Sequence, residues 1–519
     1  MLRLIRPVVL VPLAVVGVLA GTAFALPAVR GGGVDVTGLP NGPIGAKALD
    51  SVRLRIDGHG RKVALLVDGK QVASSGDVLV AGLGHLSDGK HVVTAEVDSG
   101  FPRGTLRTDR TVVVDTTPPT LSLDALKPVG IKDAVTVTGR TDAIHVSTSS
   151  SGDVEVGKDG RFSIHFDKPP VGVQVTANDA AGNTASVPLD VAVRHPEMRG
   201  VHLTALAWTS NALREPVLQL VKEGKIDTIE LDIKDEDGYI GFNSTNPLAR
   251  TIGASKGYYD APKVIAQLHA MHVRVVGRLV AFRDPALASW AYGNGKKNMV
   301  IQAPDGSPYK SRYGAISFTN FADPEVRAYN IAIATEAAKA GFDDVLYDYC
   351  RRPDGPIASM RFPGLKETPV LSVAGFMRES RAALRPLGTY VGASVFGIAA
   401  DRPTEVAQSV PEMAKYLDFV APMVYPSHWA KGEYGVADPN RQPAPIVERS
   451  LKVFQRDLVG TNVTIAPWLQ DFSLFGVTYG PGEVRAQIDA ARRNGINSFL
   501  LWNAGARYQG AALDVIPKA

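Results

Sequence analysis

The chain has 519 residues, of which 45% are hydrophobic and 21% are charged, and its formal net charge is +4. This length is too great for one hydrophobic core, so we expect about three domains at roughly 150 residues each. The small net charge and the lack of a dense Lys/Arg stripe argue against a nucleic-acid partner, and the ordinary composition argues against a disordered chain.

The first 30 residues have the pattern of an export signal. Arg3 and Arg6 precede an apolar run over residues 8–26, and Ala23-Phe24-Ala25 supplies small residues at a plausible cleavage site. Residues 1–30 are therefore predicted to be a signal peptide. The apolar run, about 19 residues long, is also long enough to remain as an N-terminal membrane anchor. Either alternative predicts a protein that is extracellular or associated with the cell envelope.

Cysteine usage limits how an exported chain can be stabilised. Cys350 is the single cysteine, so no intrachain disulfide can form and core burial must stabilise the domains. No histidine lies near Cys350 in the sequence, so we expect a buried strand residue and not a catalytic thiol.

Residues 41–196 have the pattern of two all-β domains. Short β-rich runs such as 52–56 and 63–67 are separated by Asp-Gly turns. A second set of runs follows Pro118-Pro119, and two adjacent prolines cannot donate hydrogen bonds to a sheet. The sequence predicts two β-sandwiches, one over residues 41–117 and one over residues 118–196.

Two stretches of this region resemble bacterial Ig-like domains of exported proteins. They are "VDTTPPTLSL" at 114–123 and "TANDAAGNTASVPLDV" at 176–191. The resemblance implies spacer or wall-proximal modules. Because no cluster of aromatic residues offers a platform for sugar stacking, we do not expect this region to bind the substrate.

Residues 199–517 have the alternation of strands and helices that is typical of a (β/α)8 TIM barrel. Eight short apolar runs are expected as strands, at 201–205, 228–233, 274–281, 344–349, 390–396, 419–425, 463–469 and 498–502. Helices are expected between them, at 258–272, 323–341, 370–385, 404–417, 443–458 and 481–495. A doubly wound open sheet is the main alternative, but no glycine-rich phosphate loop follows the first strand.

Carboxylates and aromatic residues follow the predicted strands at the ends where a TIM barrel carries its chemistry. Strand 2 ends in "ELDIKD", strand 4 in "YDYCR", strand 6 in "PMVYPSHW", strand 7 in "PWLQD" and strand 8 in "LWN". A sugar site needs this mixture, because carboxylates perform acid–base or nucleophilic work and flat rings stack on pyranoses.

Six motifs in chain order carry a more specific resemblance. The chain resembles the bacterial putative glycosyl hydrolase domain family, a TIM-barrel family of unknown function, over residues 199–515. The resemblance implies a glycosidase-type barrel. The motifs are "GVHLTALAWTS", "IELDIKDEDGYIGF", "VLYDYCRRPDG", "APMVYPSHWAKGEYG", "IAPWLQDF" and "FLLWNAGARY".

The chain also departs from the family pattern. Asp348 and Arg351 match the family, whereas Cys350 and Arg352 do not. Ser394 stands where Asp is common in the family. If a carboxylate at that position donated the proton, this chain would lack it.

The sequence offers several candidates for catalysis. Asp348, at the end of strand 4, is the preferred nucleophile or essential carboxylate, although an Asp bound to Arg351 for structural reasons would give the same pattern. Asp232 and Asp471 are candidates for the second catalytic carboxylate. Asp235 and Asp401 are predicted to bind substrate, and the cluster of Asp232, Lys234 and Asp235 fits an ion-pair network equally well.

The other predicted substrate contacts are one arginine and four side chains with rings: Arg351, Tyr425, His428, Trp468 and Trp502. Each of the rings could instead be a packing residue. The acidic stretch 232–238 fails the spacing of an EF-hand, so neither a metal nor a cofactor is predicted.

Taken together, these patterns predict an exported glycoside hydrolase that acts on a polysaccharide or cell-envelope glycan through paired carboxylates. Two alternatives remain. A non-catalytic glycan-binding or cell-wall scaffold protein is favoured by Ser394, and a lyase or aldolase would use Lys234 as a Schiff-base amine.

Overall fold

The computed structural model describes residues 34–102, 104–150 and 152–517. The predicted signal peptide or anchor at residues 1–30 lies outside the described residues. Over the described ranges, no helix has both the length and the apolar character needed to cross a bilayer. The chain divides into two compact units. The second holds Asp190 onward together with Leu126–Val135 and Phe166–Val171, and the first holds the rest.

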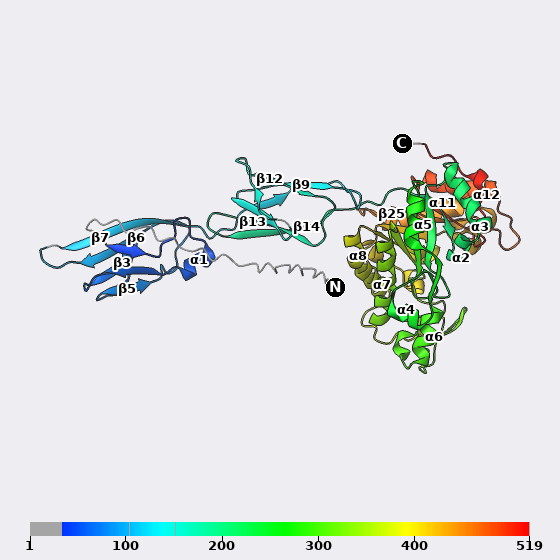
Figure 1. Cartoon of the computed structure of the whole chain (residues 1–519), viewed down its shortest axis with the longest axis horizontal. Helices are drawn as coiled ribbons and strands as arrows, with labels where there is room; N and C mark the ends of the chain where they lie inside the picture. Colours follow the sequence, from blue (N-terminus) through cyan, green and yellow to red (C-terminus); the bar gives the residue numbers. More distant parts are fainter. Residues whose placement is uncertain (1–33, 103, 151, 518–519) are drawn as a thin grey trace, which may run out of the picture. The chain divides into compact units, whose positions relative to one another are not determined.

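The first unit consists of antiparallel sheets, labelled in Figure 1. One pair of sheets has the strand orders β1-β2-β5 and β4-β3-β6-β7, and the other pair has the orders β12-β9-β8 and β11-β10-β13-β14. Buried and exposed residues alternate along strands such as β9, because one face of each sheet covers a core. The predicted pair of all-β sandwiches is confirmed.

The elements of this first unit have the following bounds: β1 Asp35–Thr37, α1 Ala46–Ser51, β2 Leu54–Asp57, β3 Val63–Val67, β4 Lys70–Ser75, β5 Val78–Ala81, β6 Gly89–Asp98, β7 Thr105–Val114, β8 Leu121–Leu123, β9 Val135–Thr141, β10 His145–Thr148, β11 Val154–Glu155, β12 Arg161–Phe166, β13 Val173–Asn178 and β14 Thr184–Leu189.

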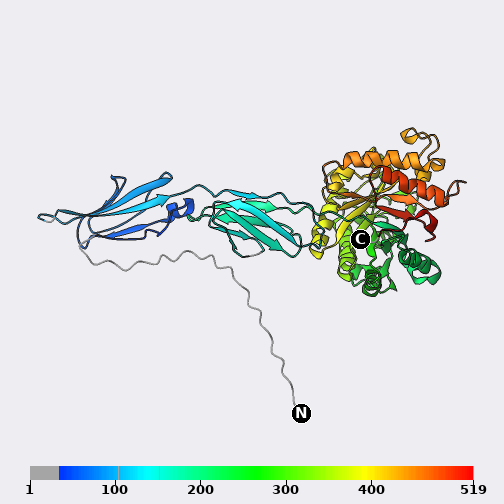
Figure 2. The ribbon, with the colours of Figure 1, turned by 90° about the horizontal axis from the view of Figure 1, so that it is seen from above.

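The second unit contains a closed parallel barrel, which confirms the predicted (β/α)8 fold. Strand β15 pairs in parallel with both β16 and β27, so the barrel is closed. Helices lie around the strands (Figure 2). The barrel strands are β15 Arg199–Leu203, β16 Thr228–Lys234, β19 Arg274–Val280, β22 Asp344–Asp348, β23 Tyr390–Phe396, β24 Phe419–Met423, the pair β25 Thr464–Ile465 and β26 Trp468–Gln470, and β27 Phe499–Trp502. The α-helices are α2 Ala205–Thr209, α3 Asn211–Lys222, α4 Pro247–Thr251, α5 Ala261–His269, α6 Pro285–Gly293, α7 Pro324–Ala340, α8 Pro369–Leu384, α9 Pro403–Val406, α10 Val410–Ala414, α11 Pro443–Asp457 and α12 Pro481–Arg493.

Several elements differ from the sequence prediction. The seventh strand is split, because Pro467 between β25 and β26 has no N–H to donate to the ladder. The helix predicted at 404–417 is broken by Ala407, whose φ of +58° is left-handed. The short strands β17 (Ile240–Phe242) and β18 (Ser255–Tyr259) extend the sheet beyond β16 and had no clear signal in the sequence.

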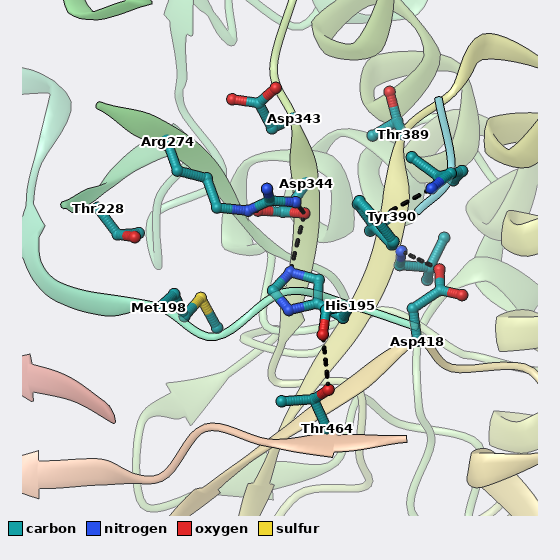
Figure 3. Close-up of polar contacts among 12 residues, drawn as sticks. His195, Met198, Thr228, Arg274, Asp343, Asp344, Thr389, Tyr390, Asp418 and Thr464 are labelled. Carbon is teal, nitrogen blue, oxygen red and sulfur yellow. Dashed lines mark hydrogen bonds and ion pairs between the residues drawn. The ribbon is translucent and has the colours of Figure 1, made fainter. Parts of the chain in front are cut away.

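The N-terminal end of the barrel is filled by the segment that enters it (Figure 3). His195 Nε2 lies 3.1 Å from Asp344 Oδ1, and Arg274 binds both oxygens of Asp344 at 2.7 Å. Ile131 and Met198 pack into the same buried cluster as Tyr390. TIM barrels carry their chemistry at the opposite end, where the βα loops gather, so we expect substrate access there.

Candidate active site

A cavity of about 370 Å³ opens at the C-terminal ends of the barrel strands. Side chains from strands β19, β22, β26 and β27 and from the segments that follow β16, β23 and β24 line it. They include two carboxylates, two arginines, one methionine and a series of aromatic rings: Glu236, Arg278, Arg312, Tyr313, Asp348, Tyr349, Phe396, Met423, Tyr425, His428, Trp429, Trp468 and Trp502. This is the mixture of charged groups and flat apolar surfaces that a sugar site requires.

The buried guanidinium of Arg278 contacts four carboxylates at the C-terminal end of the barrel. Its Nη1 donates to Asp232 Oδ1 at 2.8 Å, and its Nε and Nη2 donate to Asp348 Oδ2 at 2.9 and 2.8 Å. Nη2 also donates to Glu236 Oε1, and Nε lies 3.9 Å from Glu230 Oε1. One positive charge therefore faces four acidic groups.

Burial and this uneven charge shift the pKa values of the acidic groups apart. Burial raises the pKa of Asp232 to about 7 and that of Glu230 well above its usual range, although Arg278 opposes both shifts. Burial also disfavours the charged form of Glu236, but its contacts with Arg278 outweigh this effect and lower its pKa to about 2. Glu236 is thus ionised at neutral pH.

Asp348 lies where strand β22 ends, and its side chain is 9% exposed to the cavity region. The next residue, Tyr349, has a left-handed φ of +47°, and its N–H donates to Asp348 Oδ1 at 2.7 Å. Such backbone strain in a residue other than glycine concentrates at functional sites, because the surrounding structure has to enforce it. The turn places both Asp348 and Tyr349 on the cavity wall.

Glu236 reaches the cavity from a tight turn after β16. The Asp235 carboxylate accepts the N–H groups of Asp237 and Tyr239 at 3.0 and 2.8 Å, which holds the turn. Gly238 has a φ of +86°, and a Cβ there would lie 2.1 Å from Asp284 Oδ1. The side chain of Glu236 is 29% exposed, so it remains accessible from the cavity while it contacts Arg278.

Two tryptophans are among the aromatic side chains that line the cavity. Trp468 and Trp502 meet edge to face with ring centroids 5.5 Å apart, and Arg278 lies 5.0 Å from the Trp502 ring. Trp468 is almost fully buried and donates through Nε1 to Ser394 Oγ at 3.0 Å. Trp502 is only partly buried, so of the two it offers more ring surface to a sugar.

Tyr425 and His428 follow strand β24 and line the cavity together. Their rings lie 5.5 Å apart in an edge-to-face contact. Burial, and to a smaller extent the positive charge of Arg312, lowers the pKa of His428. His428 is therefore neutral near pH 7 and suits hydrogen bonding to sugar hydroxyls better than proton donation.

The remaining predicted site residues lie outside the cavity lining. Asp232 is buried below it, in contact with Arg278. Asp471 is buried beside the last strand, where Oδ2 accepts from Gln509 N at 2.9 Å and burial raises its pKa to about 6. Arg351 stacks at 4.2 Å over Phe396. Asp401 is exposed and accepts from the hydroxyl of Tyr434.

Two further residues that the sequence raised also lie outside the lining. Cys350 is fully buried just beyond β22, and burial raises the pKa of its thiol to about 12, which does not suit a nucleophile. Lys234 is buried and binds Asp284 Oδ2 at 2.6 Å, so its ammonium group is committed to an ion pair. Neither residue meets a substrate in this cavity.

The sequence analysis did not single out Arg278, Glu236, His202 or Glu230. Arg278 lies inside a predicted strand whose pattern is otherwise apolar. A charged residue in such a run has to be buried, and this was the sequence signal that could have identified Arg278 as a site residue. Glu236 was one of several acidic residues in "DIKDED", and the spacing alone could not tell which of them turns inward.

Residues 200–508 match the model of a family described as "Putative glycosyl hydrolase domain". Among solved structures, a hypothetical protein from Ruminiclostridium thermocellum ATCC 27405 is 30% identical over 37% of this chain and 96% of its own, with a TM-score of 0.34. The PgaB (BpsB) glycoside hydrolase domain from Bordetella bronchiseptica is 16% identical over 60% of this chain and 95% of its own, with a TM-score of 0.45. No curated protein matches the chain.

Proposed function

Because the chain belongs to the putative glycosyl hydrolase domain family, we propose that its barrel hydrolyses glycosidic bonds in a polysaccharide or cell-envelope glycan. The proposal depends on one observation above all. Asp348 and Glu236 both line the cavity and both bind Nη2 of Arg278. Glycosidases usually have a pair of carboxylates in a pocket with aromatic walls.

The spacing of this pair suits glycoside hydrolysis. Two oxygens that accept hydrogen bonds from one nitrogen lie at most about 6 Å apart. Carboxyl groups about 5 to 5.5 Å apart are typical of retaining glycosidases, whereas about 6.5 to 9.5 Å is typical of inverting ones. The pair is therefore closer to the retaining arrangement.

In the proposed reaction, Asp348 attacks the anomeric carbon and the glycosidic C–O bond breaks through an oxocarbenium-like transition state. The departing oxygen takes a proton, and water then releases the sugar from Asp348. Glu236 is the partner on the cavity wall, but Arg278 holds it ionised in the free site. We expect bound sugar to weaken the contact between Glu236 and Arg278, which would raise the pKa of Glu236 and allow it to carry the proton.

The test begins with a screen of the full chain against bacterial wall and capsule glycans. On a substrate found in this way, Asp348→Asn and Glu236→Gln should each reduce kcat/KM by roughly 10²- to 10⁴-fold, because each removes a carboxylate that acts on the reacting bond. Asp489→Asn is a matched control, since Asp489 lies on helix α12 with a half-exposed side chain. Unchanged hydrolysis by Asp348→Asn would remove the central assignment.

A second candidate function is non-catalytic glycan binding in a cell-wall scaffold. It is favoured by Ser394, which is buried in strand β23 and accepts a hydrogen bond from Trp468 where the family commonly has Asp. Glycan binding without release of reducing ends, by the wild-type chain and by Asp348→Asn alike, would support it. Release of product by the wild-type chain alone would support hydrolysis.

We also propose that the chain is exported and that the two β-sandwiches are spacers between the barrel and its site of attachment. The support is the basic and apolar pattern of residues 1–30. A fusion of residues 1–40 to a periplasmic or secreted reporter should export it. N-terminal sequencing of the mature protein would separate cleavage after residue 25 from retention as a membrane anchor.

A further inference from the structure

We propose that His202 and Asp232, with Glu230 supporting the imidazole, form a binding site for one divalent metal ion below the cavity. The three residues lie on the neighbouring strands β15 and β16, and each is at most 1% exposed. One donor atom from each lies within 4.8 Å of the other two. The inference does not depend on hydrolysis, because metal binding can be measured without a substrate.

The first argument is the arrangement of hydrogen-bond acceptors. His202 Nδ1 contacts Glu230 Oε2. In the tautomer that carries its proton on Nδ1, the imidazole donates to Glu230 and presents its lone pair at Nε2. Nε2 then faces Asp232 Oδ2 at 3.9 Å, and among residues 34–102, 104–150 and 152–517 neither atom has a hydrogen-bond partner. Two buried acceptors that face each other need a cation or a proton between them.

The distance between these two atoms fits a metal better than a hydrogen bond. At 3.9 Å the contact is too long for an N–H···O bond, which spans about 2.7 to 3.2 Å. Zinc–nitrogen bonds of about 2.0 to 2.1 Å and zinc–oxygen bonds of about 2.0 to 2.2 Å place two ligand atoms about 3.4 Å apart at a tetrahedral angle, so the two atoms would approach each other by about half an ångström to bind the ion.

The second argument is charge. Four carboxylates meet here: those of Glu230, Asp232, Glu236 and Asp348. Within the described part of the chain, Arg278 is the one lysine or arginine that forms an ion pair with any of them. Arg278 donates to Oδ1 of Asp232, and in the same described residues Oδ2 of Asp232 and Oε1 of Glu230 accept no hydrogen bond. A divalent ion would compensate this buried negative charge.

The opposite end of the barrel offers a comparison within the same molecule (Figure 3). There a fully buried histidine, His195, also lies beside a carboxylate, Asp344. Both oxygens of Asp344 are bound by Arg274, so a cation already balances the group. His202 and Asp232 lack this balance although they are equally buried.

Nitrogen and oxygen donors of this kind suit zinc, with imidazole and carboxylate ligands. The carboxylate-to-imidazole contact of Glu230 with His202 resembles the support that metal-bound histidines usually have. The sequence analysis predicted no metal, since residues 202 and 230 are 28 positions apart and only the pairing of β15 with β16 brings them together.

The experiment uses the full chain, stripped with a chelator and titrated with ZnCl2 by calorimetry and by elemental analysis after gel filtration. We expect one equivalent of zinc and a higher melting temperature. His202→Gln and Glu230→Gln should each weaken zinc binding by at least tenfold, whereas the matched variant His195→Gln should bind as the wild type does.

The outcomes are decisive without an activity measurement. The site is refuted if the wild-type chain binds no zinc, or if binding survives both His202→Gln and Glu230→Gln, which would indicate adventitious surface histidines. If His202→Gln does not fold, circular dichroism will show it, and Glu230→Gln, which keeps nearly the same shape, decides. Replacement of zinc by Co²⁺ should then give visible d–d bands that Glu230→Gln abolishes.

Discussion

At the scale of single residues, Arg278 links the acidic groups of the cavity. Its guanidinium binds Asp232, Glu236 and Asp348 while it lies 5.0 Å from the ring of Trp502. The planar group with several fixed donors can serve three acceptors at once, which the single ammonium of a lysine cannot do in the same geometry. Arg278 is therefore a positioning residue for the carboxylate pair.

We predict that Arg278→Lys will destabilise the protein and reduce its activity. Because the replacement leaves buried carboxylates without their partner, we expect a loss of about 3 to 5 kcal/mol in the free energy of unfolding. Urea unfolding measures the stability, and kcat/KM on the identified glycan measures activity. Arg312→Lys is the comparison for stability, since the Arg312 side chain is 64% exposed. Equal effects of both substitutions would contradict this role.

The shared contact of Asp348 and Glu236 with Nη2 of Arg278 gives a stereochemical prediction. Since their oxygens lie at most about 6 Å apart, hydrolysis should proceed with retention of anomeric configuration. Proton NMR of the first product formed from a defined substrate measures the configuration before mutarotation obscures it. An inverted first product would mean that Glu236 is not the partner of Asp348.

At the scale of secondary-structure elements, the two ends of the barrel differ in how their charges are arranged. At the N-terminal end, Asp344 at the start of β22 is balanced by Arg274 of β19 and faces His195 of the entering segment. At the C-terminal end of the same strand, Asp348 shares one arginine with three other carboxylates. The ion pair at the N-terminal end contributes stability. At the C-terminal end the carboxylates outnumber the one arginine, so groups remain there that can react or bind a cation.

The balanced end gives a prediction for stability and its pH dependence. Burial alone would raise the pKa of Asp344, but Arg274 and His195 lower it to about 2. Because the folded pKa is below the unfolded one, the stabilisation is present above about pH 4 and is lost as the pH falls through about 2.

We therefore expect Asp344→Asn to lower the free energy of unfolding by about 3 to 5 kcal/mol at pH 7. The difference from wild type should shrink between about pH 4 and pH 2. Denaturant unfolding at a series of pH values measures it. A difference that stays constant down to pH 2 would show that Asp344 acts through its shape and not through its charge.

At the scale of the whole molecule, the unit that contains the barrel is larger than the segment that matches the family. It includes Leu126–Val135 and Phe166–Val171 as well as the segment from Asp190. Ile131 donates its N–H to the hydroxyl of Tyr390 at 2.9 Å and packs in the same buried cluster. The barrel end is thus covered by residues that precede the first barrel strand.

This packing predicts the result of truncation. A chain that begins at residue 199 loses Ile131, His195 and Met198, which uncovers apolar surface around Tyr390. We expect it to melt at a clearly lower temperature than a chain that begins at residue 118 and keeps these contacts. Differential scanning calorimetry of the two chains provides the comparison. Equal melting temperatures would show that the covering segment contributes little.

Much of the architecture follows from local sequence patterns. Runs of buried apolar residues bounded by turns located every barrel strand to within a few residues, because strand and helix periodicities are local properties. The position of Asp348 at a strand end placed it at the mouth of the barrel, since all eight strands run parallel. The aromatic residues Tyr425, Trp468 and Trp502 reached the cavity for the same reason.

The partners of those side chains were decided by tertiary structure alone. Arg278 and Asp348 are 70 positions apart, and Arg278 and Glu236 are 42 apart, so no local pattern could predict that one nitrogen binds both carboxylates. The same holds for His202 and Asp232, whose acceptors meet only because strands β15 and β16 pair. Strand positions follow from short-range periodicity, whereas charge balance at a buried site depends on which distant strands the barrel brings together.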